Sequence, residues 1–315
     1  MSCQDLLLHR QYKSILNMPL VSIVIPTFAR PEQLSECLRA LTGQTMAACD
    51  FEVVIVDDGS PQPLDAIVAG YTRDLNITLI RQANAGPGAA RNRGVNEAKG
   101  KWIAFTDDDC LPDPQWLELL LARERRDPGT LVGGTTINGL TNELFASTSQ
   151  LIIDLVYEHF NSDPGNAYFL ASNNILCERE HILELGGFDL EFAQAGGEDR
   201  DFCDRWRSSG RRLVWCKDAH IEHRHSQTLK KFLRLHYRYG QGAYSYHRKR
   251  KERHGGNMNK DLGFHASIIA LLWPKLGRPM GYGKSLGILV GFVLWQLANA
   301  CGFFAQAFAE YRRGS

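Results

Sequence analysis

The stretch WIAFTDDD, residues 102–109, points to the fold class of this chain, because a short apolar run ends there in three consecutive acids. A continuous apolar run of this length is typical of a strand that is buried on both faces of a sheet. Two similar runs precede it, VSIVIP at 21–26 and FEVVIVDDGS at 51–60, and the second also ends in acids and a Gly-Ser turn. A further strand is expected at 77–80.

Helical segments alternate with these strands. PEQLSECLRAL (31–41) starts with a proline, a residue favoured at the first position of a helix, and its leucines share one face. We expect further helices at 64–72 and after the glycine-rich turn NAGPGAARNRG (84–94). This alternation predicts an α/β fold, a mostly parallel sheet flanked by helices on both faces. Ligands of such sheets bind at the carboxyl ends of the strands, which is where the acids lie.

Composition excludes several classes of protein. The chain has 315 residues, of which 44% are apolar, so it has room for one large domain or two modest ones. A net charge of +1 argues against a protein that binds nucleic acid through bulk charge. Ten per cent aromatic residues exclude a disordered chain. Since no two of the cysteines have CxxC spacing, we predict reduced thiols and neither a disulfide framework nor a zinc site.

The acids at the end of the 102–109 stretch are candidates for a metal site. Asp107 and Asp109 could share one divalent ion, and Mg²⁺ or Mn²⁺ prefers oxygen ligands. The alternative is a solvated acidic turn, although adjacent like charges repel unless a cation is present. His223 and His225 share one face of an extended segment, and a neutral imidazole there could complete the metal shell, with His223 the better candidate. The alternative is an ordinary surface or core histidine.

Asp58 and Arg91 are candidates for contacts to a nucleotide. Asp58 follows another strand, and its carboxylate could accept a hydrogen bond from a ribose hydroxyl or a base N–H, unless it only forms an Asp-Gly turn. The segment 84–94 lacks the dinucleotide-binding fingerprint, because Arg91 stands where the third glycine would fall. Arg91 could donate to a base carbonyl or a phosphate, and a surface helix arginine is the alternative.

Glu198 and Asp199 follow two glycines at the start of an expected helix. Asp199 could cap that helix, or it could act as a general base. Cys203 and Trp206 lie four and seven positions further on, hence on the same helical face as Asp199. Such an apolar neighbourhood would raise the pKa of the carboxyl group, as a general base requires.

Five separated blocks, taken together and in this order, resemble family 2 glycosyltransferases, which have the GT-A fold. The resemblance covers about residues 19–225. It rests on the order of the blocks, since no single block would carry it. The blocks are PTFARPEQLSECLRALTGQ, VVIVDDGS, NAGPGAARNRGVNEAKGKWIAFTDDD, GGFDLEFAQAGGED and HIEHRH.

The resemblance implies transfer of a sugar from a nucleotide-diphosphate sugar, usually with inversion, and a role for each matching position. The nucleotide-sugar site would comprise Pro26, Thr27, Asp58, Arg91, Asp107 and Asp108. The metal, Mn²⁺ or Mg²⁺, would be bound by Asp109. Asp199 would be the catalytic base and Glu198 its acceptor-side neighbour. The acceptor loop would comprise Ser172, Asn173 and Asn174.

One family motif is missing. The QxxRW signature of processive members is absent, because Phe202 stands where the glutamine before Arg205-Trp206 would fall. We therefore expect an enzyme that adds one sugar rather than a polymerase. Two other functions stay open: a nucleotidyltransferase, which also uses acids at a sheet end, and a non-catalytic sugar-binding protein with a transferase fold. The intact Asp107, Asp109 and Asp199 argue against the second.

We expect three regions: a polar leader at 1–18, a GT-A domain at 19–235 and a basic, then apolar, membrane-associated region at 236–315. Leu286–Ala309 contains no charge in 24 residues, and as a helix it would be roughly 36 Å long, enough for a bilayer core of about 30 Å. The alternative is an amphipathic helix buried in a soluble domain. Whether the segment spans the bilayer or lies in its interface is left open.

Polar residues and flanking charges refine this expectation. Gln296, Asn299 and Gln306 fall on one narrow stripe, which suits contact with a partner helix or with a headgroup layer. The heavier positive charge, including the run at 247–253, lies on the catalytic side of the apolar segment. Together with an N-terminus that lacks a secretory core, this predicts the cytoplasmic face of the cell membrane, with a glycan or lipid-linked acceptor as partner and no nucleic acid.

Overall fold

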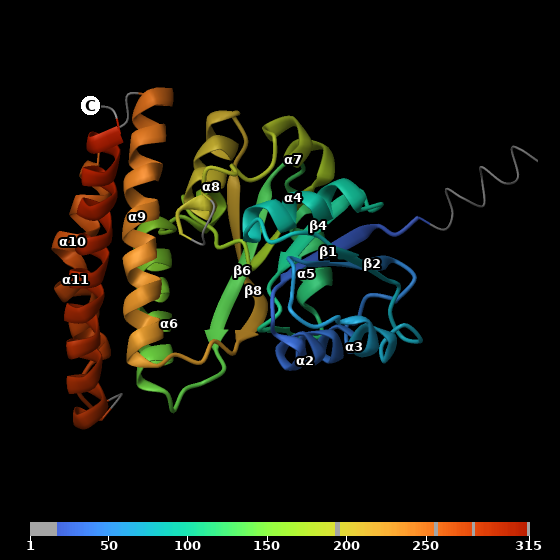
Figure 1. The fold of residues 1–315 in the computed structure, drawn as a ribbon, viewed down its shortest axis with the longest axis horizontal. Helices are drawn as coiled ribbons and strands as arrows, with labels where there is room; N and C mark the ends of the chain where they lie inside the picture. Colours follow the sequence, from blue (N-terminus) through green and yellow to red (C-terminus); the bar gives the residue numbers. More distant parts are fainter. Residues whose placement is uncertain (1–17, 193–195, 255–257, 279–280, 314–315) are drawn as a thin grey trace, which may run out of the picture.

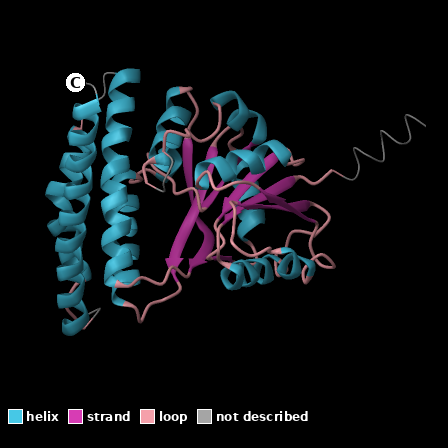
Figure 2. Cartoon of the chain, viewed as in Figure 1, coloured by secondary structure: helices cyan, strands magenta, loops and turns pink. Residues whose placement is uncertain are grey.

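The computed structural model describes residues 18–192, 196–254, 258–278 and 281–313, so nearly all of the expected leader lies outside the described residues. Within them, eight strands form one sheet in the order β3-β2-β1-β4-β7-β6-β8-β5, and helices cover it (Figures 1 and 2). The strands are β1 Val21–Thr27, β2 Phe51–Asp57, β3 Ile77–Arg81, β4 Trp102–Thr106, β5 Cys110–Pro112, β6 Leu131–Asn138, β7 Asn174–Glu178 and β8 Leu213–His223.

The helices alternate with the strands in the first half of the chain and dominate its end. The α-helices are α2 Pro31–Leu41, α3 Asp65–Ala69, α4 Pro87–Glu97, α5 Trp116–Arg126, α6 Leu144–Phe160, α7 Arg179–Leu185, α8 Glu198–Ser208, α9 Leu229–His254, α10 Asn259–Leu272 and α11 Tyr282–Arg313.

Strands β3, β2, β1 and β4 run parallel to one another, as the apolar runs predict. The register pairs Val21 with both Phe51 and Trp102, so the acids that follow β2 and β4 emerge at the same edge of the sheet. The sheet is more mixed than the sequence indicates, because β7 runs antiparallel to both β4 and β6. In the second half, the extended segment expected at His223 is the end of one long strand, β8.

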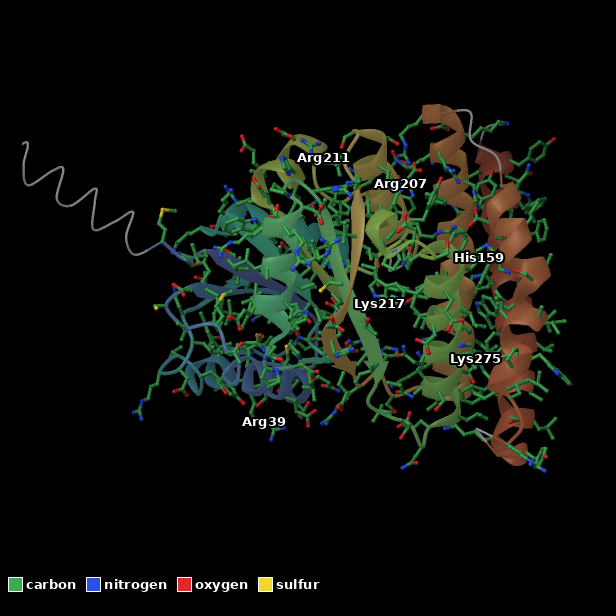
Figure 3. All side chains as sticks on the ribbon, turned by 180° about the vertical axis from the view of Figure 1, so that it is seen from behind. Arg39, His159, Arg207, Arg211, Lys217 and Lys275 are labelled. Carbon is green, nitrogen blue, oxygen red and sulfur yellow. The ribbon has the colours of Figure 1, made fainter. Side chains whose placement is uncertain are left out.

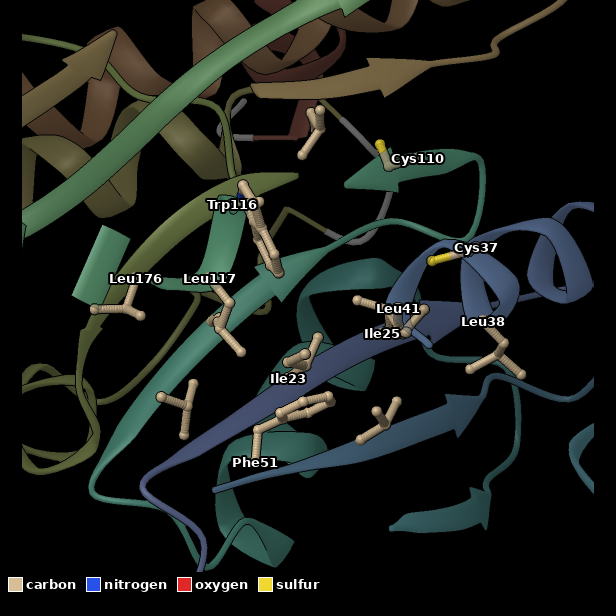
Figure 4. Close-up of a cluster of buried hydrophobic side chains, with 14 of the residues drawn as sticks. Ile23, Ile25, Cys37, Leu38, Leu41, Phe51, Cys110, Trp116, Leu117 and Leu176 are labelled. Atoms are coloured by element: carbon tan, nitrogen blue, oxygen red, sulfur yellow. The ribbon is translucent and has the colours of Figure 1, made fainter. Parts of the chain in front are cut away.

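Two apolar cores hold the helices on the sheet. Alternate side chains of β1 point to opposite faces, so Ile23 and Ile25 belong to a core with α2, α3 and α5. Figure 4 shows this core, in which Trp116 and Phe51 are buried. Val24 belongs to the second core, with residues of α4, α7 and α8. The two cores fix the strand ends, and hence the acids, in place.

A helical layer of α6, α9, α10 and α11 stands beside the sheet domain (Figure 1). It has a third core of its own, to which α6 contributes Leu155, α9 Phe232, α10 Phe264 and α11 Trp295. The domain boundary expected at 235 falls inside α9, a single continuous helix.

Gly94 fixes how closely α4 can approach β1. A Cβ atom at this position would lie 2.3 Å from Cγ1 of Val24. We therefore expect Gly94→Ala to lower the free energy of unfolding by about 1–3 kcal/mol, as overpacking does. Urea titration followed by circular dichroism measures the change. Gly263→Ala is the matched control, since no atom lies within 4 Å of its Cβ position; an equal loss in both variants would contradict the packing argument.

Candidate active site

A cleft of about 1130 Å³ lies at the carboxyl edge of the parallel strands. Its wall combines the ends of β1, β2 and β4 with residues of α4, α8, α9 and the end of β8. The predicted site residues that line it are Pro26, Thr27, Asp58, Arg91, Asp107, Asp108, Asp109, Ser172, Asn173, Glu198, Asp199 and His223. Side chains from distant parts of the sequence therefore meet in one cavity.

Asp109 lies between two histidines. Strand β5 pairs antiparallel with β8, with Cys110 opposite His223, and this pairing brings the residue before β5 to the end of β8. The Oδ1 atom of Asp109 is 3.2 Å from Nε2 of His223, and its Oδ2 atom is 3.0 Å from Nδ1 of His225. One ligand atom from each of the three residues lies within 4.8 Å of the other two, so the group could hold a metal ion.

The charges around Asp109 keep its carboxylate ionised, as a metal ligand has to be. Burial opposes the ionisation of Asp109, but hydrogen bonds from His223 and His225 outweigh it and hold the pKa of the carboxyl group well below its usual range. Arg30 places its guanidinium Nη1 2.9 Å from Oδ2 of the same carboxylate, so a cation already contacts the centre. Carboxylate and imidazole ligands together suit Mn²⁺ better than Mg²⁺, which prefers oxygen.

His225 and Arg30 also contact Asp109, although the sequence favoured His223 over His225 and gave no reason to single out Arg30. The spacing of His223 and His225 in HIEHRH indicated that they share a face, and both indeed contact Asp109. The signal for Arg30 was weaker, a single arginine in the loop after β1. Its partner Asp108 lies 78 positions away, at 3.0 Å from Nη1.

Asp108 joins the ends of β1 and β4. Thr27 donates its hydroxyl to Oδ2 at 2.7 Å, and Arg30 donates to Oδ1. Burial raises the pKa of Asp108 to about 6, despite the charge of Arg30. Since both carboxylate oxygens already have protein partners, Asp108 is suited to positioning the strand ends.

Asp58 and Arg91 lie on the other side of the acids. The carboxylate of Asp58 accepts hydrogen bonds from Gln82 Nε2 at 2.8 Å and from the backbone N–H groups of Ala85 and Gly86 at 2.9 Å, which fixes the turn before α4. Arg91, on α4, is buried and donates from Nη2 to Asp107 at 2.7 Å. Its Nε and Nη1 atoms have no hydrogen-bond partner among the described residues.

Glu198 and Asp199 are the first two residues of α8, and both line the cleft. Gly197 has φ of 95°, and a Cβ there would lie 2.7 Å from the carbonyl oxygen of Gly242, so this turn needs glycine and presses α8 against α9. Asp199 does not cap its own helix; its Oδ2 accepts from the backbone N–H of Ser172 at 3.1 Å. Its Oδ1 is buried without a partner among the described residues.

The environment of this acid pair makes it basic. Burial raises the pKa of Asp199, and the sequence expectation of an apolar neighbourhood agrees, since Cys203 and Trp206 are buried on the same helix. Burial and the charge of Asp199 raise the pKa of Glu198 to about 7. A buried carboxylate with a raised pKa and a free oxygen is the arrangement that a general base needs.

Only part of the predicted acceptor loop lines the cleft. Ser172 and Asn173 line the cleft, whereas Asn174 is fully buried in the sheet. The amide of Asn174 donates to the carbonyl of Thr135 at 3.1 Å and accepts from Trp116 Nε1 at 2.8 Å. Asn174 therefore ties β7 to its neighbours and lies outside the cleft lining.

The pKa of Glu198 predicts a pH dependence of stability. The pKa of the Glu198 carboxyl group rises from 4.5 to about 7 on folding, so the native state binds more protons than the unfolded state. The contribution of this group to the free energy of unfolding is therefore complete below pH 4.5 and is lost as the pH rises through 7. Glu198→Gln should therefore unfold like the wild type at pH 4.5 but be more stable by roughly 1–3 kcal/mol at pH 8. Denaturant titrations at both pH values measure this. An equal difference at both would contradict the burial of a charged Glu198.

Comparison with known proteins identifies the family of the chain. The family model described as Glycosyl transferase family 2 matches residues 22–186, more than half of the chain. The chain belongs to glycosyltransferase family 2. It is thus a glycosyltransferase with the GT-A fold, and the matched segment contains both acidic clusters of the cleft, Asp57-Asp58 and Asp107–Asp109.

Two similar proteins illustrate this family 2 membership. Glycosyltransferase AglE from Haloferax volcanii is 37% identical over 120 residues, which cover 37% of this chain and 39% of AglE. Glucosyl-dolichyl phosphate glucuronosyltransferase from the same organism is 25% identical over 217 residues, covering 65% of this chain and 69% of that protein. The match to AglE thus spans well under half of AglE's length.

Among solved structures, mannosyltransferase PcManGT from Pyrobaculum calidifontis, in complex with GDP-Man and Mn²⁺, has the same fold. The superposition has a TM-score of 0.65 with 17% sequence identity and covers 97% of this chain and 93% of the other. The likeness therefore extends through the helical layer of this family 2 glycosyltransferase, well beyond residues 22–186.

Proposed function

We propose that this protein transfers one sugar at a time, with inversion and with a divalent metal, from a nucleotide-diphosphate sugar to a hydroxyl group of a lipid-linked or surface-polysaccharide acceptor. The observation that carries the proposal is the joint presence, in one cleft, of the Asp109–His223–His225 group and the buried acid pair of α8. The first suits a leaving diphosphate, and the second suits an attacking hydroxyl.

The donor's nucleotide would lie against the ends of β1, β2 and β4. Asp58 holds the turn before α4, and this rigid turn supports the place where a base and ribose would bind. The Nε and Nη1 atoms of Arg91 have no partner among the described residues, and each could donate a hydrogen bond to a base carbonyl or a phosphate oxygen. PcManGT, which shares the fold, binds GDP-Man, and this supports a nucleotide sugar as donor.

Asp109, His223 and His225 would hold the metal, and Mn²⁺ is the ion we favour. A bound divalent ion supplies positive charge that stabilises the departing diphosphate. The chain's own part is to keep Asp109 ionised and to hold His223 Nε2 and His225 Nδ1 at 3.2 and 3.0 Å from its oxygens, where a metal ion would replace the shared protons. Arg30 adds a second positive charge at the same carboxylates.

Asp199 would take the proton from the acceptor hydroxyl as that oxygen attacks the anomeric carbon. The backbone N–H of Ser172 orients one carboxylate oxygen and leaves the other for the acceptor. Burial excludes water and keeps the carboxylate basic. One displacement from the face opposite the leaving group inverts the anomeric centre.

The cleft continues past Asp199 along α9, and this supports an acceptor with an anionic head and an apolar tail. Lys231, Arg234 and Arg238 line it on one face of α9 and form no ion pair with a described residue. Beyond them the wall includes the aromatic residues Phe264 and Trp295 of the helical layer. The name of the glucuronosyltransferase relative also contains a lipid phosphate.

Replacing Arg234 tests the acceptor site. We expect Arg234→Gln to raise the acceptor KM about tenfold or more, since hydrogen bonds to charged groups contribute roughly 1.5–3 kcal/mol, and to leave the donor KM unchanged. Initial rates against a polyprenyl phosphate-linked sugar measure both constants. Lys230→Gln is the control, because Lys230 lies on α9 outside the cleft lining. A rise in the donor KM alone would place the charge at the donor diphosphate.

A donor panel tests the proposed chemistry as a whole. The purified protein is incubated with UDP- and GDP-linked sugars, with Mn²⁺ or with EDTA, and released nucleoside diphosphate is measured. We expect release from one donor class, dependent on Mn²⁺. Release of pyrophosphate from a nucleotide triphosphate would indicate a nucleotidyltransferase, and binding without release would indicate a non-catalytic protein. Either result would contradict the proposal.

We also propose that the protein works at the cytoplasmic face of the cell membrane. Among the described residues, one helix, Tyr282–Arg312, is long and apolar enough to cross a membrane. The basic run at 247–253 precedes it, and such a run is attracted to the cytoplasmic leaflet, which carries anionic lipids.

A further inference from the structure

Helix α11 has its apolar residues on the outside. One side chain every three or four positions is exposed along its whole length, which makes one continuous stripe. Every exposed residue within 286–309 is apolar. The stripe comprises Tyr282, Leu286, Leu289, Val290, Val293, Leu297, Ala300, Cys301, Phe304, Phe308 and Tyr311.

The polar and small residues of α11 face the protein instead. A Cβ atom at Gly302 would lie 1.9 Å from the carbonyl oxygen of Tyr237 on α9, so the two backbones touch there. Gly240 of α9 approaches the carbonyl of Asn299 in the same way, at 2.0 Å. Gln296, Asn299 and Gln306 of the polar stripe are only partly exposed, whereas the apolar stripe is exposed, so α11 is the reverse of a helix on the surface of a water-soluble domain.

Helix α11 is packed against the catalytic part over its whole length. Its first half lies on α6, where a Cβ atom at Gly291 would be 2.8 Å from the Thr148 side chain. Its second half lies on α9, and Arg248 there pairs with Glu310 at 3.0 Å. Figure 1 shows the three helices side by side.

This packing decides between the two membrane arrangements that the sequence leaves open. If α11 crossed a bilayer, α9 would have to enter the bilayer with it, and charged residues in hydrocarbon are costly. Helix α9 carries charged residues toward both ends, and the uncharged stretch between them, 239–247, is too short to cross the hydrocarbon core. The charged residues are Lys230, Lys231, Arg234, Arg238, Arg248, Lys249, Arg250, Lys251, Glu252 and Arg253.

Helix α10 extends the apolar surface. Its exposed residues again recur every three or four positions, at Leu262, Ala266, Ile269 and Trp273. Aromatic residues and cations mark the ends of the helices, as they do at membrane interfaces: Trp273 and Lys275 follow α10, and Arg312 ends α11. Lys275 also pairs with Glu158 of α6 at 2.6 Å and lies beside that helix in Figure 3.

We propose that α10 and α11 form a docking face that lies flat in the interface of a lipid bilayer, without crossing it. The two stripes would enter the boundary between headgroups and acyl chains. We commit to a bilayer as the occupant, because the stripe on α11 is apolar from Leu286 to Phe308, about 33 Å of helix, and aromatic and basic residues lie at both ends of that helix. The proposal gives a definite geometry to the membrane association proposed above and does not depend on the sugar chemistry.

The topology is tested with the full chain, carrying a C-terminal epitope tag, added to preformed vesicles of phosphatidylcholine and phosphatidylglycerol. We expect the protein to float with the vesicles after a high-salt wash, because apolar insertion is not screened by salt. Protease added outside should then remove the tag as well as the catalytic domain. A tag that is protected while the catalytic domain is digested would overturn the proposal, and so would failure to float.

A pair of variants tests the face itself. Val293 and Leu297 are each 59% exposed, and we expect V293Q/L297Q to lower vesicle affinity roughly tenfold without changing thermal stability. Leu190→Gln is the matched control, since Leu190 is 58% exposed in the loop before α8 and outside the face. Equal vesicle affinity of the wild type and both variants would overturn the proposal that this face binds the bilayer. If the wild type were a dimer without detergent and V293Q/L297Q a monomer, the proposal would also be overturned, because a second copy of the chain would then cover the face. Donor turnover in detergent should be normal throughout, which separates this result from the catalytic proposal.

Discussion

Asp199→Asn is expected to lower the rate of sugar transfer by about a thousandfold, because general-base catalysis contributes roughly 10²–10⁴ to a rate. The amide keeps the size of the side chain and can still accept from the backbone N–H of Ser172, so the fold and the loop should survive. What is lost is the proton acceptor beside the attacking hydroxyl. Single-turnover rates with bound donor measure the loss.

The affinity of Asp199→Asn for nucleoside diphosphate should stay within about threefold of the wild type, since its carboxylate contacts α8 and the loop at Ser172 rather than the strand ends. Asp218→Asn, an exposed carboxylate on β8 outside the cleft lining, is the control and should be fully active. A collapse of nucleotide affinity with a normal rate per bound donor would make Asp199 a donor ligand instead of a base.

Asp109→Asn should produce the second large effect, a loss of about 10²–10³ in transfer rate, as removal of one preorganised charge at a developing anion typically causes. The variant removes the only carboxylate of the Asp109–His223–His225 group and leaves one amide oxygen where two carboxylate oxygens faced the two histidines. Rates measured across a range of Mn²⁺ concentrations report the effect.

Histidine variants refine this test. His225→Ala should weaken the dependence on Mn²⁺ less than Asp109→Asn does, because an imidazole contributes a lone pair and no charge. His220→Ala is the matched control, since His220 lies on the same strand but outside the cleft lining. Normal activity of the wild type in EDTA would contradict the proposed dependence on a divalent metal.

The sequence was informative wherever neighbouring residues set the outcome. Runs such as 51–57 are buried on both faces, so their composition alone indicates parallel central strands. The acids after β2 and β4 were expected at one edge, because parallel strands end there together. The raised pKa of Asp199 was also expected, since its apolar neighbours lie on its own helix.

Features that depend on distant contacts were not predictable in the same way. Asn174 was expected in the acceptor loop, but its amide oxygen accepts a hydrogen bond from Trp116, 58 positions away, and the side chain is buried in the sheet. Arg30 finds its partner Asp108 only once β1 and β4 are adjacent. The polar stripe of α11 indicated a partner helix, yet only the close contact of Gly302 with Tyr237 identifies that partner as α9.

Asp109, His223 and His225 should bind a divalent ion together with a nucleoside diphosphate. Calorimetric titration of Mn²⁺ into the protein, alone and with saturating GDP or UDP, tests it most directly. We predict that one of the two nucleotides tightens Mn²⁺ binding roughly tenfold or more, because its phosphates complete the ligand shell, and that Asp109→Asn abolishes the binding. Mn²⁺ affinity that is the same with and without both nucleotides, or unchanged in Asp109→Asn, would contradict the account.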